Sequence, residues 1–439
     1  MERTLINLTP GKVGETIKVA GWVQTVRSHG KISFVDLLDR SGVLQIVIEG
    51  DCSFHPNDVV ELTGVVKSRP KNLVNPNIST GNVELEAKET RVLSYAQELP
   101  FDMGAKELDL QLPTLLDHRS LTLRHSKVKA IFKVQEALIE GFRKSAKELD
   151  CTEVFVPTIS ASATEGGAEL FKFPYFDNEA YLVQSPQLYK QIMVGVFERV
   201  YLTSHIYRAE PSVTTRHLVE SVQMDFEIGF IEKMEDILDA MEFSYTALVR
   251  YAQETCSEEL KLLGVEPSLV DAKVPRLKMR EAQKIIFERT GVDHRTEPDL
   301  MPEDEKEIAA WALEEYNSDL VTITHFPTKK RAFYSIPDPE NPEYSLSYDL
   351  LYKGLEVSSG AQRIHDYNKL VETIKSRGMN PENFEMYLQG FRYGMPPHGG
   401  FSFGLERTTM KLLNLANIRE ASLYPRDMER VDFSFSKNK

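Results

Sequence analysis

Short runs in which apolar and polar residues alternate occupy the first hundred positions of the chain. Alternation with a period of two is typical of strands with one buried face, and it predicts five strands, at 16–23, 32–37, 43–48, 59–66 and 83–85. Turn-forming sequence separates them, including Ser28-His-Gly and a long loop from Arg69 to Gly81. Five short strands predict a small barrel such as an OB-fold, and the pattern is equally typical of other small β domains.

The pattern changes after residue 93. Residues 101–125 are predicted to be a linker or hinge, and apolar positions spaced for one helical face then predict a helix over 127–149. Further strands are predicted at 180–183, 199–203, 221–230, 331–336, 346–359 and 384–391, and further helices at 234–262, 278–288 and 404–415. Strands and helices outside a strict βαβ alternation predict an α+β domain on an antiparallel sheet over 126–439, behind a barrel domain over 1–100.

Composition agrees with a globular protein of two domains. A chain of 439 residues is too long for one compact core, and 41% hydrophobic with 27% charged residues excludes a disordered or fibrous protein. No run approaches the roughly 18 apolar residues of a membrane helix, and the first residues lack the pattern of a signal peptide. Three cysteines lie far apart, which argues against a disulfide framework or a cysteine zinc site and predicts a cytoplasmic protein.

The net charge of −14 argues at first against a nucleic-acid partner. The charge is unevenly distributed, because residues 1–100 carry a net charge of only −1. The acidity therefore belongs to the C-terminal part, and the N-terminal part retains the capacity for a nucleic-acid surface.

The chain lacks a G-x-x-x-x-G-K-[ST] loop, a G-x-G-x-x-G element and an H-E-x-x-H element. The phosphates of a bound nucleotide would therefore have to be held by another kind of binding group. Arginine can provide it, because its planar guanidinium binds phosphate in a bidentate manner. Between two predicted strands, Arg208, Glu210 and Arg216 lie on a hairpin that can direct arginines to phosphates and a carboxylate to a nucleobase amine. A glycine-rich segment, Gly394–Arg407, precedes the last helix. Each feature alone is more typical of a surface salt bridge or a turn.

Together these segments resemble class II aminoacyl-tRNA synthetases, and among them the aspartyl-tRNA synthetases of the shorter, archaeal or eukaryotic-like form. The resemblance covers nearly the whole chain. It rests on Val154-Phe-Val-Pro157, Thr164-Glu165-Gly-Gly167, Gln184-Ser-Pro-Gln187-Leu-Tyr-Lys190, Tyr207–Glu227, Glu356-Val-Ser-Ser359-Gly-Ala-Gln-Arg363 and Gly399–Arg407. The H-x-G-H element of the class I enzymes is absent, and the spacing from Asp225 to Asp349 is too short for the inserted domain of the standard bacterial form. The N-terminal segments 27–30 and 69–81 look more bacterial, so the source organism stays open.

The resemblance implies an N-terminal OB-fold joined to a class II catalytic domain, and a reaction in two steps. ATP activates L-aspartate to aspartyl-adenylate with release of pyrophosphate, and the acyl group then passes to the terminal adenosine of tRNA. Arg208, Arg407 and Glu356 would be catalytic. The implied ATP contacts are Arg208, Ala209, Glu210, Arg216, His217, Leu218, Glu356, Gly404, Leu405, Glu406 and Arg407.

Magnesium is the implied cofactor, with Glu356 and Ser359 as ligands and Asp349 nearby, because oxygen ligands shared with phosphates suit this ion. The implied aspartate contacts are Glu165, Gln187, Leu188, Tyr189, Lys190, Arg208, Ser359 and Arg363. Lys190 and Arg363 are the cations expected to distinguish a β-carboxylate from the carboxamide of asparagine.

The resemblance also implies a homodimer, formed through the helix at 127–149 and Pro157, and anticodon binding by Arg27, Phe34 and Gln45. The partner would be tRNA(Asp). Whether tRNA(Asn) is charged as well stays open, although Gln24 and the 69–81 loop occupy the region where that choice is made. Two alternatives are a related asparagine synthetase, which would lack the barrel, and a non-catalytic tRNA-binding paralogue, which should have lost Arg208, Arg407 or Glu356.

Overall fold

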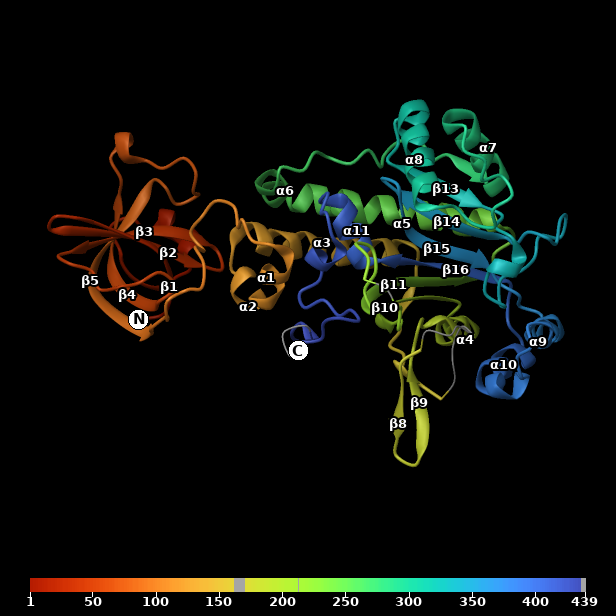
Figure 1. Ribbon diagram of the computed structural model, residues 1–439. Helices are drawn as coiled ribbons and strands as arrows, with labels where there is room; N and C mark the ends of the chain where they lie inside the picture. Colours follow the sequence, from red (N-terminus) through yellow and green to blue (C-terminus); the bar gives the residue numbers. More distant parts are fainter. Residues whose placement is uncertain (162–169, 212, 436–439) are drawn as a thin grey trace. The chain divides into compact units, whose positions relative to one another are not determined.

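A computed structural model describes residues 1–161, 170–211 and 213–435. The chain divides into two compact units, a barrel unit of Met1–Asp109 and a C-terminal unit of Leu110–Lys439 (Figure 1). Within the described ranges, no helix is long and apolar enough to cross a membrane.

The barrel unit is a closed five-stranded barrel in the order β1-β2-β3-β5-β4, which confirms the predicted OB-fold. Inward-facing side chains such as Val19, Leu37, Leu44 and Leu62 are fully buried, as the alternation predicted. All five predicted strands are present and each is longer than predicted, with the bounds β1 Thr16–His29, β2 Ile32–Asp39, β3 Gly42–Glu49, β4 Val59–Ser68 and β5 Val83–Ser94. Short 3₁₀ turns occur at η1 (Ile6–Lys12) and η2 (Lys71–Leu73).

The C-terminal unit is built on an eight-stranded sheet in the order β12-β13-β14-β15-β16-β11-β10-β6. The predicted antiparallel pairing holds for the ladders from β13 to β10, while the two edge pairs, β12 with β13 and β6 with β10, are parallel. The strands are β6 (Thr152–Glu153), β10 (Arg199–Tyr207), β11 (Glu220–Gly229), β12 (Arg276–Lys278), β13 (Leu320–Thr324), β14 (Ser347–Tyr352), β15 (Leu355–Gln362) and β16 (His398–Gly404).

One face of this sheet packs on helices. Phe142 of α3 (Ser126–Glu148) contacts Phe226 of β11 and Phe403 of β16 through edge-to-face rings, and α5 (Met234–Thr255) packs along α3 (Figure 1). The apolar face of the predicted helix is therefore buried against its own sheet and α5. The helices α6 (Ser257–Leu263) and α11 (Leu405–Leu412) complete this core.

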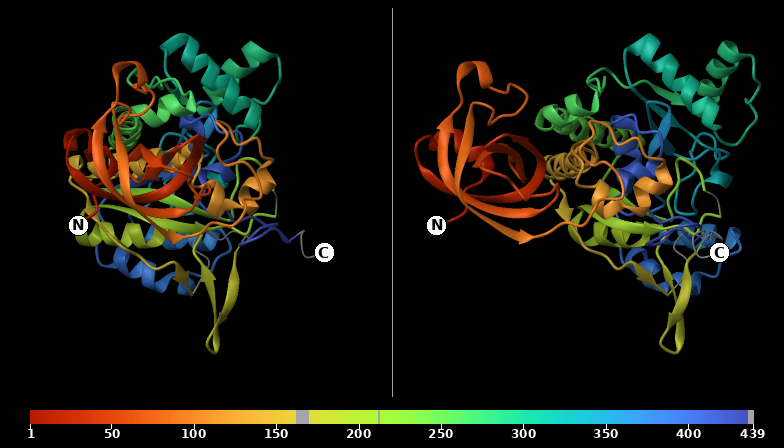
Figure 2. Two further views of the ribbon diagram at one scale, coloured as in Figure 1. Left: turned by 90° about the vertical axis from the view of Figure 1, so that its left-hand side faces the viewer. Right: turned by 60° about the vertical axis from the view of Figure 1, so that its left-hand side comes forward.

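Other helices pack at the two ends of the sheet. At one end, α4 (Gln187–Phe197), α9 (Tyr367–Ser376) and α10 (Glu385–Arg392), with η4 (Pro381–Phe384), form a second apolar cluster. At the other end, α7 (Met279–Thr290) and α8 (Pro302–Tyr316) pack on β13. A small sheet is formed by β7 (Ile159–Ser160), β8 (Lys172–Tyr175) and β9 (Asn178–Leu182). Its β8–β9 hairpin projects from the rest of the C-terminal unit (Figures 1 and 2). The remaining turns are η3 (Thr328–Lys330) and η5 (Ile418–Ala421).

Several predicted elements differ from the structure. Residues 385–392 form helix α10, because Tyr387, Leu388 and Phe391 are spaced for one helical face and all three are buried. Residues 331–336 form no strand, since the Ser335 amide turns back to the Ala332 carbonyl. The predicted strand at 346–359 is a hairpin of β14 and β15. Part of the predicted linker is helical, in α1 (Leu112–Asp117) and α2 (Arg119–Thr122).

Candidate active site

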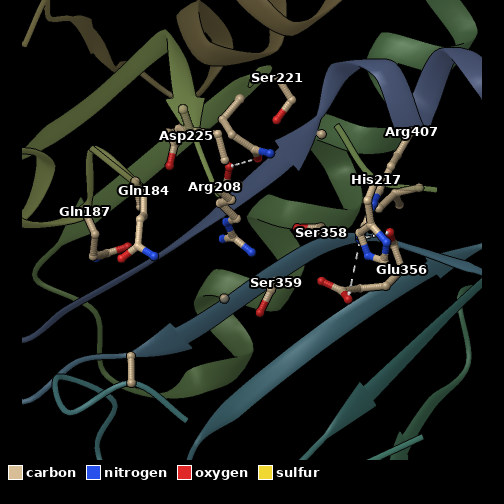
Figure 3. Close-up of a pocket in the computed structure, with 18 of the residues that line it drawn as sticks. Gln184, Gln187, Arg208, His217, Ser221, Asp225, Glu356, Ser358, Ser359 and Arg407 are labelled. Atoms are coloured by element: carbon tan, nitrogen blue, oxygen red, sulfur yellow. Dashed lines mark hydrogen bonds and ion pairs between the residues drawn. The ribbon is translucent and has the colours of Figure 1, made fainter. Parts of the chain in front are cut away.

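A cavity of about 430 Å³ lies on the face of the sheet opposite α3 and α5. Strand alternation creates this face: Met224 and Phe226 of β11 point into the helix-covered core, while Gln223 and Asp225 line the cavity. Figure 3 shows Arg208, directly after β10, together with polar side chains of β11 and β15 and with Arg407, converging on this space. The sheet thus presents a largely polar face to the cavity and an apolar face to the helices.

Two cations, Lys190 and Arg363, and the Asp225 carboxylate line the floor of the cavity, and the fully buried Glu227 carboxylate, which does not line it, pairs with both cations. Lys190 Nζ, on α4, lies 2.8 Å from Asp225 Oδ1 and 3.4 Å from Glu227 Oε2. Arg363 Nε donates to Glu227 Oε1 at 2.9 Å, and Arg363 Nη2 donates to the Gln187 amide oxygen at 3.3 Å. All four charged side chains are at most 4% exposed. Burial raises the pKa of Asp225 against the opposing effect of Lys190, whereas in Glu227 the effect of burial is overcome by Arg363 and Lys190, which lower its pKa.

A glycine on the neighbouring strand makes room for this cluster. Gly400 of β16 lies directly opposite Glu227 of β11, and a Cβ at this position would come within 2.2 Å of Glu227 Oε2. Any other residue would displace the carboxylate that holds Arg363. The glycine of the predicted motif therefore has a packing reason at this position.

Cationic side chains from the β10–β11 hairpin lie along the other half of the cavity. Arg208 follows β10 directly, lines the cavity and is exposed, and it forms no ion pair with any residue that the structure describes. Arg216 pairs with Glu305 of α8 at 3.2 Å, and His217 Nδ1 lies 3.7 Å from Glu210 Oε2. Burial lowers the pKa of His217, an effect that Glu210 opposes. Arg208 is thus available to an anionic ligand.

Glu356 and Ser359 share the cavity face because β15 contains a bulge. Residues three apart on a regular strand point to opposite faces. Here Glu356 pairs with Leu351 and Ser358 pairs with Leu350, so Val357 is an extra residue and restores the common face. Both side chains line the cavity, and Arg407 Nη1 donates to the Glu356 carbonyl at 2.9 Å and lies 3.6 Å from its carboxylate.

Asp349 lies opposite Ser359 across the β14–β15 ladder and is not among the residues that line the cavity. Arg331 covers it and donates to both carboxylate oxygens, at 3.0 Å and 2.5 Å. No three metal-ligating side chains of the described residues converge on one point. Glu356 and Ser359 are hard oxygen donors that open to the cavity, and this pair fits Mg²⁺ whose remaining ligands are phosphate and water.

Some of the other residues predicted to contact ATP or aspartate line the cavity, and others do not. Leu188 and Leu405 are buried in apolar clusters, and Tyr189 and Ala209 do not line the cavity, whereas Leu218, Gly404 and Glu406 do. Glu406 is buried, which raises its pKa to about 7, and its carboxylate accepts from the Val222 amide. Glu165 lies outside the described residues.

Sequence reasoning missed several polar residues of the site. Arg331 and Tyr334 line the cavity from the segment predicted as a strand, and Glu305 approaches Arg216 from the unpredicted helix α8. Burial, reinforced by Glu356, raises the pKa of Glu305 to about 7. Gln223 and Ser402, bonded to each other at 2.6 Å, form part of the wall. Gln223 and Ser402 carried a sequence signal, since both lie within the motif segments 207–227 and 399–407, whereas Arg331, Tyr334 and Glu305 lie outside them.

The predicted anticodon residues lie on one outer face of the barrel unit. Arg27 and Phe34 are partners across β1 and β2, and Arg27 forms an ion pair with Asp36 at 2.9 Å. Phe34 is half-buried and packs edge-on to His29, with ring centroids 6.0 Å apart. Gln45 is Asp36's partner on β3, is 8% exposed, and donates to Glu84 at 3.0 Å.

Both units match known families. Residues 111–428 match the tRNA synthetases class II (D, K and N), and residues 17–93 match the OB-fold nucleic acid binding domain. The chain is 41% identical to an aspartate–tRNA(Asp/Asn) ligase of Thermus thermophilus, covering 98% of this chain and 99% of that protein. It is 39% identical to an aspartate–tRNA(Asp) ligase of Pyrococcus furiosus, with coverages of 95% and 96%.

Solved structures of class II aminoacyl-tRNA synthetases are similar to this chain over nearly its whole length. An asparaginyl-tRNA synthetase from Pyrococcus horikoshii, in complex with asparaginyl-adenylate, superposes with a TM-score of 0.89 at 31% identity over 98% of this chain and 99% of that chain. A putative aspartyl-tRNA synthetase from Leishmania major has a TM-score of 0.86 at 27% identity, with coverages of 98% and 95%. With a family match over most of its length and full-length relatives near 40% identity, the chain belongs to the class II aminoacyl-tRNA synthetases of the D, K and N group.

Proposed function

We propose that this enzyme is an aspartate–tRNA ligase that activates L-aspartate with ATP and transfers it to tRNA(Asp). The observation that carries the proposal is the pair of buried cations, Lys190 and Arg363, on the cavity floor. A neutral carboxamide needs no such cations, whereas a desolvated β-carboxylate does. Arg363 Nη1 has no hydrogen-bond partner among the described residues, so it can donate to a substrate.

The same floor suits the rest of the amino acid. Asp225 and the Gln187 amide oxygen line the cavity beside the two cations, and they offer acceptors for a substrate ammonium group. Aspartate carries one positive and two negative groups, so it matches a site in which cationic and anionic side chains lie close together. The names of the full-length relatives in Thermus and Pyrococcus support the same substrate.

Adenylate formation brings two anions together, so positioning and charge neutralisation carry the reaction. The α-carboxylate attacks the α-phosphorus, and pyrophosphate leaves. Arg208, exposed to the cavity, is placed to bridge the carboxylate and the α-phosphate, and Arg407 to hold the γ-phosphate. Mg²⁺ would neutralise charge on the phosphates, held by Glu356 and Ser359. Arg216, His217 and Glu210 line the same cavity and would contact the rest of ATP.

ATP–pyrophosphate exchange with aspartate, asparagine and lysine in parallel tests this function. We expect exchange with aspartate, and less than one-hundredth of that rate with the other two. Exchange with asparagine alone would assign the enzyme to the asparagine branch, and no exchange with any of the three would favour a non-catalytic tRNA-binding protein. Parallel charging of tRNA(Asp) and tRNA(Asn) then decides between the two specificities that the relatives represent.

The proposal includes a cytoplasmic homodimer. Support for the dimer is the large apolar side chain of Phe155, which is 87% exposed beside Pro157 in the segment that follows α3. Support for the compartment is that Cys52, Cys151 and Cys256 are all unpaired.

A further inference from the structure

Arg331 is held rigidly at the edge of the cavity, on the segment between β13 and β14. Besides its two bonds to Asp349, its Nη1 donates to Ser359 Oγ at 3.1 Å. Its guanidinium carbon lies 3.8 Å from the centre of the Phe326 ring. The side chain is thus fixed on one face by an aromatic ring and at its tip by three hydrogen bonds.

These bonds place a cation on the oxygens that a metal would use. Ser359 is one of the two proposed Mg²⁺ ligands, and Asp349 is the carboxylate that adjoins it across the ladder. The second ligand, Glu356, has its own cationic neighbour in Arg407 at 3.6 Å. Each of these two carboxylates therefore has an arginine beside it, Arg331 at Asp349 and Arg407 at Glu356.

We propose that Arg331 is a positioning residue that makes divalent-metal binding depend on the nucleotide. The inference rests on the magnesium role proposed above for Glu356 and Ser359. Without ATP, a divalent ion meets carboxylates that are already paired with arginines, and it must compete with the Arg331 guanidinium for Ser359. ATP adds the negative charge and the phosphate oxygens that make a second cation favourable. The metal thus enters together with the triphosphate, and Arg331 keeps Ser359 oriented until then.

The test measures Mn²⁺ binding to the full-length protein without nucleotide, by the electron paramagnetic resonance signal of free Mn²⁺. Arg331→Gln leaves Asp349 without its counter-ion, so we expect it to bind Mn²⁺ at least tenfold more tightly than the wild type. Lys330→Gln, the charge-matched control on the adjacent cavity residue, should bind like the wild type. With a non-hydrolysable ATP analogue, all three proteins should bind Mn²⁺. Equal or weaker nucleotide-free binding by Arg331→Gln would overturn the proposal.

A second variant guards against loss of folding in the first. Arg331→Lys keeps the charge but cannot reach Asp349 and Ser359 together, so its nucleotide-free affinity should lie between those of the wild type and Arg331→Gln. A Mn²⁺ affinity of Arg331→Lys identical to that of the wild type would also contradict the proposal, because the simultaneous hydrogen bonds of the guanidinium to Asp349 and Ser359 would then have no role. The Mn²⁺ titration needs neither aspartate nor tRNA, so a failed aspartate assignment in the exchange assay leaves its outcome intact.

Discussion

At the scale of single residues, the site is a cluster of charged side chains that are shielded from solvent and pair with one another. Lys190, Asp225, Glu227 and Arg363 are all buried within one cluster. A buried charge that loses its partner costs more than an exposed one, because water cannot replace the lost interaction. Substitutions here should therefore have large effects on substrate binding.

Replacing Lys190 with Met removes the charge and keeps much of the apolar stem. The β-carboxylate would meet Asp225 without its cation, and losing one partner of a buried pair costs about 2–5 kcal/mol. We expect kcat/KM for aspartate in pyrophosphate exchange to fall at least thirtyfold, with ATP binding little changed. Lys172→Met is the matched control, since Lys172 is half-exposed on β8 and pairs with Glu179. An unchanged kcat/KM in Lys190→Met would remove Lys190 from the aspartate site.

Glu406 makes stability depend on pH. Its pKa is raised by burial to about 7, above its value in the unfolded chain, so the folded state favours the protonated acid. The stability this contributes is present at acidic pH and is lost as pH rises through about 7. Glu406→Gln keeps an acceptor for the Val222 amide without the charge, so it should gain about 2–3 kcal/mol over the wild type between pH 5 and pH 8.

Thermal unfolding at pH 5, 6.5 and 8 measures this difference. The melting temperature of Glu406→Gln, relative to the wild type, should rise with pH. The exposed Glu340→Gln serves as control and should show a constant offset. A difference for Glu406→Gln that does not change with pH would show that the carboxyl titrates normally.

At the scale of elements, strand geometry decides which residues can act together. The Val357 bulge in β15 brings Glu356 and Ser359 to one face, although their spacing of three would separate them on a regular strand. In the barrel unit, the direct pairings of Arg27 with Phe34 and of Asp36 with Gln45 gather the proposed anticodon contacts on two neighbouring ladders.

Phe34→Ala tests the role of this barrel face. Stacking on an aromatic side chain is worth about 1–3 kcal/mol per base, so kcat/KM for tRNA charging should fall about tenfold while pyrophosphate exchange stays unchanged. Gln45→Ala should act in the same direction, and Leu8→Ala, an exposed apolar residue on η1, should change neither step. Normal charging by folded Phe34→Ala and Gln45→Ala would refute the anticodon assignment, and a parallel loss of both steps would indicate damage to the fold.

At the scale of the whole molecule, the proposed dimer needs a surface that the fold leaves exposed. The apolar face of α3 is already buried against α5 and the sheet, so it is not available to a second subunit. Phe155, beyond the end of α3, remains exposed. An obligate interface buries on the order of 2,000 Å² or more, and a central apolar side chain contributes strongly to it.

Light scattering at micromolar concentration should therefore give twice the chain mass of 50.0 kDa. Phe155→Asp should shift the protein toward the monomer mass, because a charge would be buried in the interface. Tyr393→Asp, at an aromatic residue that is 79% exposed, is the control and should stay dimeric. A wild-type monomer would contradict the dimer.

The sequence by itself determined the barrel strands and the long helix α3. Their signals are local, because a strand that buries one face must alternate and a helix that buries one face must repeat every three to four residues. The motif segments also identified most of the cavity wall, including Lys190, Arg208 and Arg363. Local pattern failed at β13, where every residue is buried and no alternation remains, and at helix α10, which is too short for its three buried residues to establish a period.

Only the tertiary structure decided which charges become partners. Lys190 reaches Asp225 across 35 positions, and Arg331 reaches Asp349 and Ser359 from a segment without a motif. Such pairs depend on strand order, on the Val357 bulge and on the space left by Gly400, none of which is encoded in a short window of sequence. Residue types therefore predicted the chemistry of the site, and long-range packing determined its geometry, because desolvation and distance are properties of the assembled fold.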